Sequence, residues 1–301
     1  MRTQHTRFCR IEIQQPDKLS NILISRYPDI SSTKQEHNLE EEMKCIEDFA
    51  GVWKRTVLYE PIGELGPEEE QRKDIIWIQG ADGYFIDIRY EIGAQSHIQM
   101  KSFAGSGNYD SSTAHFTWSR TYDFRPAGSP DVGLMRVIKG SNHSPEQLEE
   151  DGVLSGDNYR EIWDKISVGC SETDCTAKLS WVDKEGVTSR EGIFLVVGDW
   201  FAVTLSRAVK ANSVDVINKA FNSDVKLTAE ENEHLWEYVA AMGSSSTWEV
   251  RFALQPALRG VQLLPNTDTV SNPLSELFDA QSGWKWQFVS GKPPEALAGR
   301  V

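Results

Sequence analysis

Charged and aromatic side chains alternate along several segments of this 301-residue chain, in a pattern suited to a binding site. The segment Tyr159-Arg-Glu161-Ile-Trp163 shows the pattern most clearly. Because successive side chains of a β-strand point to opposite faces, Tyr159, Glu161 and Trp163 would share one face of a strand. Asp87 and Arg89 would share a face in the same way. Carboxylates can transfer protons, while guanidinium groups and aromatic rings can orient a ligand.

The same alternation predicts one charged cluster inside a barrel. With Trp53 facing inward, the first strand also sends Arg55, Val57 and Tyr59 inward. A later strand places Phe116, Trp118, Arg120 and Tyr122 on one face. We expect catalytic groups at Glu161, Asp87 and Tyr159, and ligand-binding groups at Arg55, Trp77, Arg89, Trp118, Arg120 and Trp163. Two alternatives remain open: inward charges that only neutralise one another, or a shifted alternation that leaves these charges in solvent.

The acidic run Glu149-Glu150-Asp151-Gly152 allows two interpretations. Asp-Gly is a common turn sequence, so a solvated turn is favoured. The alternative is that the run places a carboxylate at the barrel mouth as an acid or base.

Several common chemistries find no support in the sequence. The six histidines are scattered without metal-ligand spacing, so no metal is expected. No glycine-rich nucleotide loop and no Gly-x-Ser-x-Gly elbow occurs, so no cofactor and no serine triad are expected. A net charge of −14 argues against nucleic acid as a partner. No apolar run is long enough for a membrane span, and no secretory signal is evident, so we expect a cytoplasmic protein with reduced cysteines. The oligomeric state is left open.

The elements that would position these side chains are mostly β-strands. Alternating segments separated by turn sequences predict an antiparallel meander that closes into an up-and-down barrel. The expected strands are 52–60, 74–80, 84–91, 96–104, 113–123, 132–139, 158–167, 176–183, 187–198, 200–209 and 248–254, with a strand-like piece at 284–288. Gly105-Ser-Gly-Asn108 is expected to be a turn. Helices are expected from Thr33 to about Asp48, over 213–221 and over 228–242.

This pattern divides the chain into three parts. Residues 1–45 form a polar arm and helix, and residues 46–255 form the barrel with a helical insertion at 213–242. Residues 256–301 form an irregular tail rich in Pro and Gly punctuation. We find no internal repeat.

The segment Phe49-Ala-Gly51-Val-Trp53-Lys-Arg55 resembles the first-strand Gly-x-Trp motif of the calycin superfamily, which includes the lipocalins. The resemblance implies a lipocalin-like barrel whose Trp is covered by an Arg from a late strand, for which Arg207 and Arg251 are the candidates. Residues 49–205 are also similar to a family of uncharacterised lipocalin-like proteins. The motifs that carry this similarity are Trp77-Ile-Gln79, Phe85-Ile-Asp87-Ile-Arg89, Phe103-Ala-Gly105, Thr117-Trp-Ser-Arg120, Asp123, Pro126, Asp131-Val-Gly133, Glu150-Asp-Gly152 and Tyr159-Arg-Glu161-Ile-Trp163.

Three functions are compatible with such a cluster. The first is an intracellular protein that binds a small amphipathic or anionic molecule, with Arg89 and Arg120 meeting an anionic group. The second is a cofactor-independent isomerase, cyclase or hydratase that uses Glu161 or Asp87 as acid or base. The third is a structural protein whose barrel is filled by its own side chains.

Overall fold

The computed structural model describes a core of strands and their short connections. All described residues belong to the unit Glu41–Val301. They are residues 43, 45–91, 97–98, 102–123, 130–141, 144–154, 156–169, 172, 174–182, 186, 188–205, 237–242, 249–253 and 284–292. Within them, no helix is long and apolar enough to cross a membrane.

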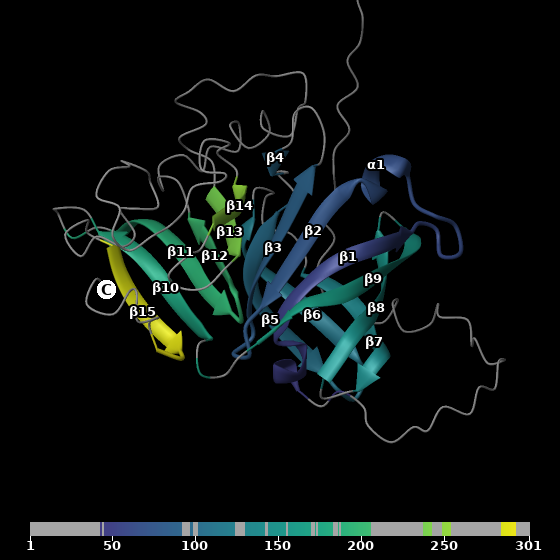
Figure 1. Ribbon diagram of the computed structural model, residues 1–301, viewed down its shortest axis with the longest axis horizontal. Coiled ribbons are helices and arrows are strands. Elements are labelled where there is room, and N and C mark those ends of the chain that lie inside the picture. The colour runs from purple at the N-terminus through teal and green to yellow at the C-terminus, as the bar shows by residue number, and fades with distance from the viewer. Residues whose placement is uncertain are drawn as a thin grey trace, which may run out of the picture. The chain divides into compact units, whose positions relative to one another are not determined.

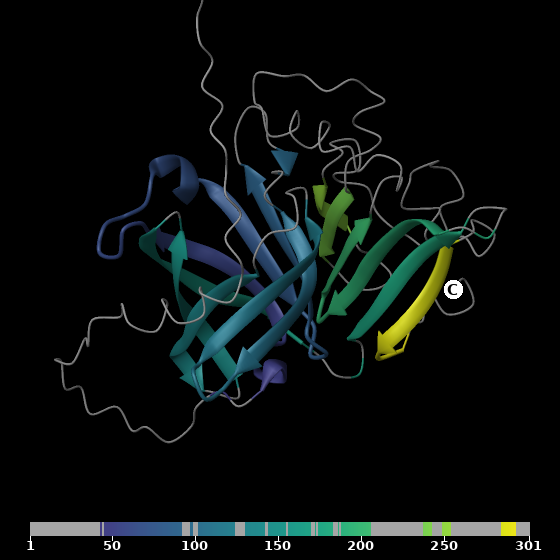
Figure 2. The ribbon, with the colours of Figure 1, turned by 180° about the vertical axis from the view of Figure 1, so that it is seen from behind.

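Eight antiparallel strands close a barrel (Figures 1 and 2). They are β1 (Gly51–Tyr59), β2 (Lys73–Gln79), β3 (Tyr84–Glu91), β5 (Phe103–Asp110), β6 (His115–Asp123), β7 (Asp131–Ser141), β8 (Ser144–Leu154) and β9 (Asp157–Val168). Each strand pairs with the next along the chain, and β9 pairs back with β1. The short β4 (His97–Ile98) pairs with β3 alone. The prediction of a mainly β, antiparallel barrel is therefore confirmed.

The Gly-x-Trp segment begins β1 with a fully buried indole. Gly51 has φ of +148°, a conformation that glycine adopts most readily, and a Cβ there would lie 3.0 Å from Lys165 Cε. The Nε1–H of Trp53 donates to the carbonyl of Phe49 at 2.8 Å. Lys165 lies opposite Trp53 on β9 and places its Nζ 4.6 Å from the centroid of the indole ring.

Among the described residues, the cation over Trp53 is thus a lysine of the neighbouring strand, and the expectation of Arg251 is wrong. Arg207 lies outside the described residues. Arg251 belongs to a different sheet, where its guanidinium pairs with Glu249 at 3.1 Å. The motif resemblance pointed to a covering cation, but only the pairing of β1 with β9 shows which residue supplies it.

A second sheet packs against the outside of the barrel. Its strands, in spatial order, are β14 (Glu249–Ala253), β13 (Glu237–Met242), β12 (Trp200–Leu205), β11 (Thr188–Val197), β10 (Cys175–Val182) and β15 (Trp284–Ser290). Outward side chains of β3 such as Ile86 and Ile88 share one buried cluster with Ile193, Leu195 and Ala202 of this sheet. The closed barrel therefore ends at Val168, and the strands expected over 176–209 belong to the second sheet.

The helix predictions are largely unsupported. Residues 237–242, expected in a helix, form strand β13 and pair with β12 in the second sheet. Ile46–Phe49 forms a single 3-10 turn, η2, where the end of the N-terminal helix was expected. The one α-helix among the described residues is the four-residue α1 (Glu68–Gln71). The remaining helix predictions, 33–42, 213–221 and 228–236, lie outside the described residues.

Two further local predictions are wrong. Gly105–Asn108, expected to be a turn, lies within β5, where Gly105 pairs with Arg120 and Asn108 with Thr117. The acidic run Glu149–Gly152, interpreted as a solvated turn, lies in the middle of β8. Cys45 and Cys175 are free thiols, whereas Cys170 lies outside the described residues.

Candidate functional site

The barrel interior has two layers of different chemistry. One layer is an aromatic core in which Phe49, Trp53, Trp77 and Phe116 are almost completely buried. Beside it lies a cavity of about 210 Å³ to which all eight barrel strands contribute side chains. The described lining residues are Arg55, Leu58, Glu60, Glu70, Trp77, Asp87, Arg89, Phe103, Trp118, Asp131, Glu150, Val153, Tyr159, Glu161 and Trp163. Val153 is 50% exposed, so the cavity reaches the surface beside this residue.

Aromatic rings separate the cavity from the core beneath it. Trp77 makes edge-to-face contacts with Trp118 and Trp163, at centroid distances of 5.6 and 5.9 Å, and it stacks on Trp53 at 6.0 Å. Such contacts hold the rings more firmly than burial alone, because aromatic pairs add about 0.5–1.5 kcal/mol each. The aromatic wall of the cavity is therefore rigidly supported from below.

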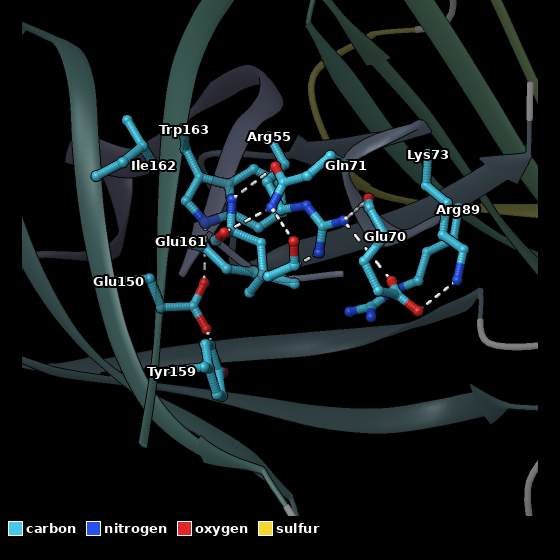
Figure 3. Close-up of polar contacts among 12 residues, drawn as sticks. Arg55, Glu70, Gln71, Lys73, Arg89, Glu150, Tyr159, Glu161, Ile162 and Trp163 are labelled. Atoms are coloured by element: carbon cyan, nitrogen blue, oxygen red, sulfur yellow. Dashed lines mark hydrogen bonds and ion pairs between the residues drawn. The ribbon is translucent and has the colours of Figure 1, made fainter. Parts of the chain in front are cut away.

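A buried ion pair joins the β1 and β9 sides of the cavity. Arg55 Nη1 donates to Glu161 Oε1 at 2.6 Å, and Arg55 Nη2 donates to the carbonyl of Glu70 at 2.8 Å (Figure 3). Glu70 also pairs with Lys73, so α1 is tied to the barrel through charged groups. Both charges of the Arg55–Glu161 pair are compensated within the barrel.

A second ion pair lies on β3, between Asp87 and Arg89. The Arg89 Nε–H donates to Asp87 Oδ1 at 3.0 Å, and the guanidinium lies 5.3 Å from the Phe103 ring centroid. Burial raises the pKa of Asp87, and Arg89 opposes that rise. Although burial opposes it, the neighbouring carboxylates Asp87 and Glu161 raise the pKa of Arg89, so this guanidinium stays charged.

Glu150 is a buried carboxyl group on the side of the cavity that β8 and β9 form. It lies opposite Glu161 in the β8–β9 pairing. Tyr159 Oη–H donates to Glu150 Oε1 at 2.8 Å, and Trp163 Nε1–H donates to Oε2 at 3.0 Å (Figure 3). Burial raises the pKa of Glu150 well above its usual value, and the charges of Glu161 and Asp131 raise it further.

The alternation of β8 explains why Glu150 alone of its acidic run enters the barrel. Its neighbours Glu149 and Asp151 bind arginines on the outer surface: Arg136 Nη1 lies 2.6 Å from Glu149 and 2.7 Å from Asp151, and Arg160 Nε lies 2.7 Å from Asp151. These outward ion pairs keep Glu150 on the inner face.

Two glycines leave space for side chains that line the cavity. A Cβ at Gly133 would lie 2.6 Å from Glu150 Cγ, and a Cβ at Gly152 would lie 2.4 Å from the Tyr159 ring. Both distances are too short for non-bonded carbon atoms, so a side chain at either position would displace the cavity residue. The glycines of the motifs Asp131-Val-Gly133 and Glu150-Asp-Gly152 therefore have the same role, because each leaves space for a side chain that lines the cavity.

Most residues expected in the cluster do line the cavity. Glu161, Asp87 and Tyr159 line it, as do Arg55, Trp77, Arg89, Trp118 and Trp163. Arg120 is not among the described lining residues: its guanidinium lies 5.7 Å from the Phe103 ring centroid and 3.4 Å from Asp123. Arg120 thus contacts the ring of a lining residue, Phe103, without being a described lining residue itself.

At two places a shift in strand pairing changes which side chains face inward, so the faces expected from simple alternation are wrong there. The register of β1 against β9 shifts between Arg55 and Val57, after which Leu58 faces the cavity in place of Val57 and Tyr59. A shift between β5 and β6 likewise turns Tyr122 outward into the cluster against the second sheet. A bulge adds one residue to one strand and so exchanges its faces beyond that point.

The sequence reasoning did not assign seven lining residues to the cavity. These are Leu58, Glu60, Glu70, Phe103, Asp131, Glu150 and Val153. The sequence did contain a signal for Glu150. In a strand, Glu150 must face the side opposite to its neighbours Glu149 and Asp151, so the three carboxyl groups cannot all face solvent. Phe103 and Asp131 begin two of the motifs that carry the family resemblance, whereas Leu58, Glu60, Glu70 and Val153 had no local signal. Among the described residues, no group of three or more His, Cys, Asp or Glu side chains is arranged to hold a metal ion.

Comparison with protein-family models matches residues 60–261 to the family described as Protein HRI1. This match covers more than half of the chain, from the end of β1 to beyond β14. Neither a search of curated proteins nor a search of solved structures gave a significant match.

Proposed function

Since this chain belongs to the HRI1 protein family, whose description names no activity, we propose from its cavity that it binds a small amphipathic molecule inside the barrel. The observation that carries the proposal is a cavity of about 210 Å³ that combines aromatic walls with charged groups. Ligand sites in proteins are typically concave, mostly apolar and equipped with a few fixed polar groups.

The barrel interior is only partly filled by side chains, which supports ligand binding over a purely structural role. Large side chains such as Trp53 and Phe116 fill one layer completely. In the other layer, Gly133 and Gly152 leave room for the side chains of Glu150 and Tyr159, and a cavity remains beside these side chains. Such an interior space is what a ligand site requires, whereas a structural barrel gains stability by filling it.

The proposal includes a lipocalin-like mode of binding, in which the ligand enters at one end of the barrel and the Trp53 end stays closed. The complete burial of Trp53 and the exposure of Val153 support this direction. We also propose a cytoplasmic site of action, on the sequence grounds given above.

Native mass spectrometry of the gently purified protein tests the proposal. We expect a retained small molecule that is released on denaturation. Val153→Trp would place a large ring at the exposed edge of the cavity and should reduce the retained mass. Val168→Trp is the matched control, because Val168 is also an exposed valine of the barrel but does not line the cavity.

Loss of the retained mass in Val153→Trp alone would support binding in the barrel. Equal retention in both variants would place the ligand elsewhere. A bare protein mass, together with no stabilisation by any amphipathic compound of matched size, would argue for a structural barrel.

A second candidate function is acid–base catalysis in the same cavity. Of the candidate groups, Glu161 and Asp87 are each held by an arginine, whereas Glu150 receives hydrogen bonds from the neutral donors Tyr159 and Trp163. Burial raises the pKa of Glu150 well above its usual value, so this carboxyl group holds a proton more readily than an exposed one and can act as an acid.

The retained molecule, once identified, distinguishes catalysis from binding. An enzyme would convert that molecule or its precursor, and Glu150→Gln would abolish turnover while the compound still binds. Glu161→Gln and Asp87→Asn are the parallel variants. Unchanged turnover in all three would rule out carboxylate catalysis in this cavity.

A further inference from the structure

The described lining of the cavity carries more carboxyl groups than basic groups. Among the described lining residues, six carboxyl groups face two guanidinium groups. The carboxyl groups belong to Glu60, Glu70, Asp87, Asp131, Glu150 and Glu161. Of the carboxyl groups in excess, Glu150 is only 4% exposed, and Glu60 and Asp131 are half-buried.

Both arginines already have carboxylate partners. Arg55 binds Glu161 at 2.6 Å, and Arg89 binds Asp87 at 3.0 Å. Glu70 pairs with Lys73, whose side chain is itself buried. An incoming anion would therefore have to compete with bonds that the arginines make within the barrel, and it would enter a field dominated by negative charge.

Within the described part of the chain, Glu150 and Asp131 form no ion pair with Lys or Arg, although the charge of the Arg89 guanidinium attracts both at longer range. Glu150 lies opposite Glu161, and like charges directly across neighbouring strands repel. A positive charge at this point would relieve that repulsion, while the hydrogen bonds from Tyr159 and Trp163 keep Glu150 in place.

The aromatic wall adds a second element of cation recognition. Trp77, Trp118 and Trp163 line the same cavity as Glu150 and Asp131. The face of an aromatic ring attracts a cation, and the attraction strengthens when the site is shielded from water. Aromatic rings also provide apolar contact for the carbon skeleton of a ligand, which a bare metal ion does not use.

We propose that the ligand of this cavity is an organic ammonium ion, with its charged nitrogen at Glu150 and Asp131 and its apolar body against the tryptophans. This inference rests on the proposed function, because it assigns a chemical class to the ligand of the same site.

Titration calorimetry with three probes of similar size and different charge tests the inference. The probes are the phenethylammonium cation, neutral 2-phenylethanol and the 3-phenylpropionate anion. We expect the cation to bind most tightly to the full-length protein at neutral pH. Loss of one charged hydrogen bond should weaken its binding by about tenfold in Asp131→Asn and in Glu150→Gln. Asp157→Asn, which removes the same charge from an exposed residue outside the cavity, should leave the affinity unchanged.

The outcomes separate this inference from the function on which it rests. Tightest binding of the alcohol or of the anion would overturn the ammonium assignment and leave small-molecule binding intact. Equal loss of affinity in Asp157→Asn would also overturn it, because the effect would then be unspecific. Binding of calcium ions that excludes the phenethylammonium cation would assign the carboxylates to a metal. Failure of all three probes, with no molecule retained in the native mass spectrum, would overturn the inference together with the proposed function.

Discussion

Glu150 and Glu161 lie directly opposite each other on β8 and β9, and both side chains enter the barrel. Their hydrogen-bond partners differ. Glu161 receives a guanidinium N–H from Arg55, whereas Glu150 receives the hydroxyl of Tyr159 and the indole N–H of Trp163. One wall of the cavity therefore holds an ion-paired carboxylate beside a carboxyl group that forms no ion pair within the described part of the chain.

Glu150→Gln should change the pH dependence of stability. Burial raises the folded-state pKa of Glu150 above its usual value of 4.5. Between these two pKa values the folded protein binds more protons than the unfolded chain, so this group's contribution to stability declines as pH rises above about 4.5. Gln carries no such proton, and we expect the decline between pH 5 and 8 to be smaller in Glu150→Gln. Urea unfolding across this range measures the difference; parallel curves for the two proteins would contradict the prediction.

Arg55→Met should destabilise the barrel strongly. The side chains of Arg55 and Glu161 are only 4% and 9% exposed, and removal of one partner from a buried pair leaves an uncompensated charge. We expect a loss of about 3–5 kcal/mol in the free energy of unfolding. Lys139→Met, which breaks the exposed pair with Glu146, should cost about 0–1 kcal/mol. Chemical denaturation measures both; equal losses would show that the buried pair is not structurally important.

Gly152→Ala should disturb the position of Tyr159. The new Cβ would lie 2.4 Å from the phenol ring, and overpacking of this kind costs about 1–3 kcal/mol. If the clash with Tyr159 is the cause, the double variant Gly152→Ala with Tyr159→Leu should lose less than the sum of the two single variants. A double-mutant cycle from urea unfolding tests this; additive losses would place the strain elsewhere.

Lys165 should make the protein more stable as the solution becomes alkaline. Burial lowers the pKa of Lys165 to about 8, from the usual 10.5, although Asp48 opposes the shift. Between about pH 8 and 10.5 the unfolded chain binds more protons than the folded protein, so this lysine's contribution to stability increases with pH. Lys165→Met should remove that increase, whereas Lys139→Met, at an exposed position, should retain it. Thermal unfolding from pH 7 to 10 compares the variants; an unchanged slope in Lys165→Met would refute the prediction.

Much of the candidate site could be predicted because its signals are local. Alternation within one strand correctly places Asp87 with Arg89, and Tyr159 with Glu161 and Trp163. The same reasoning was wrong beyond each bulge, where Leu58 replaces Val57 and Tyr122 turns outward. A bulge depends on the pairing of two strands, so the sequence of one strand does not reveal it.

The errors at Gly105 and at Gly152 have a common origin. Glycine next to polar residues usually marks a turn, which is how both segments were interpreted. In the structure each glycine lies within a strand, where a side chain would collide with a neighbour: with the Ser119 backbone at Gly105 and with the Tyr159 ring at Gly152. Close packing between strands, not a turn, excludes a side chain at these positions.

The sequence by itself determined the mainly β composition, the inward position of Trp53 in a barrel and the charged, aromatic character of its interior. Side-chain alternation and turn chemistry act over a few residues and can be read along the chain. Only the tertiary structure decided that the barrel closes from β9 to β1, that Lys165 covers Trp53, and that Glu150 enters the cavity. It also decided the charge balance of that cavity, because ion pairs such as Arg55–Glu161 join residues 106 positions apart that come together only when the strands pair.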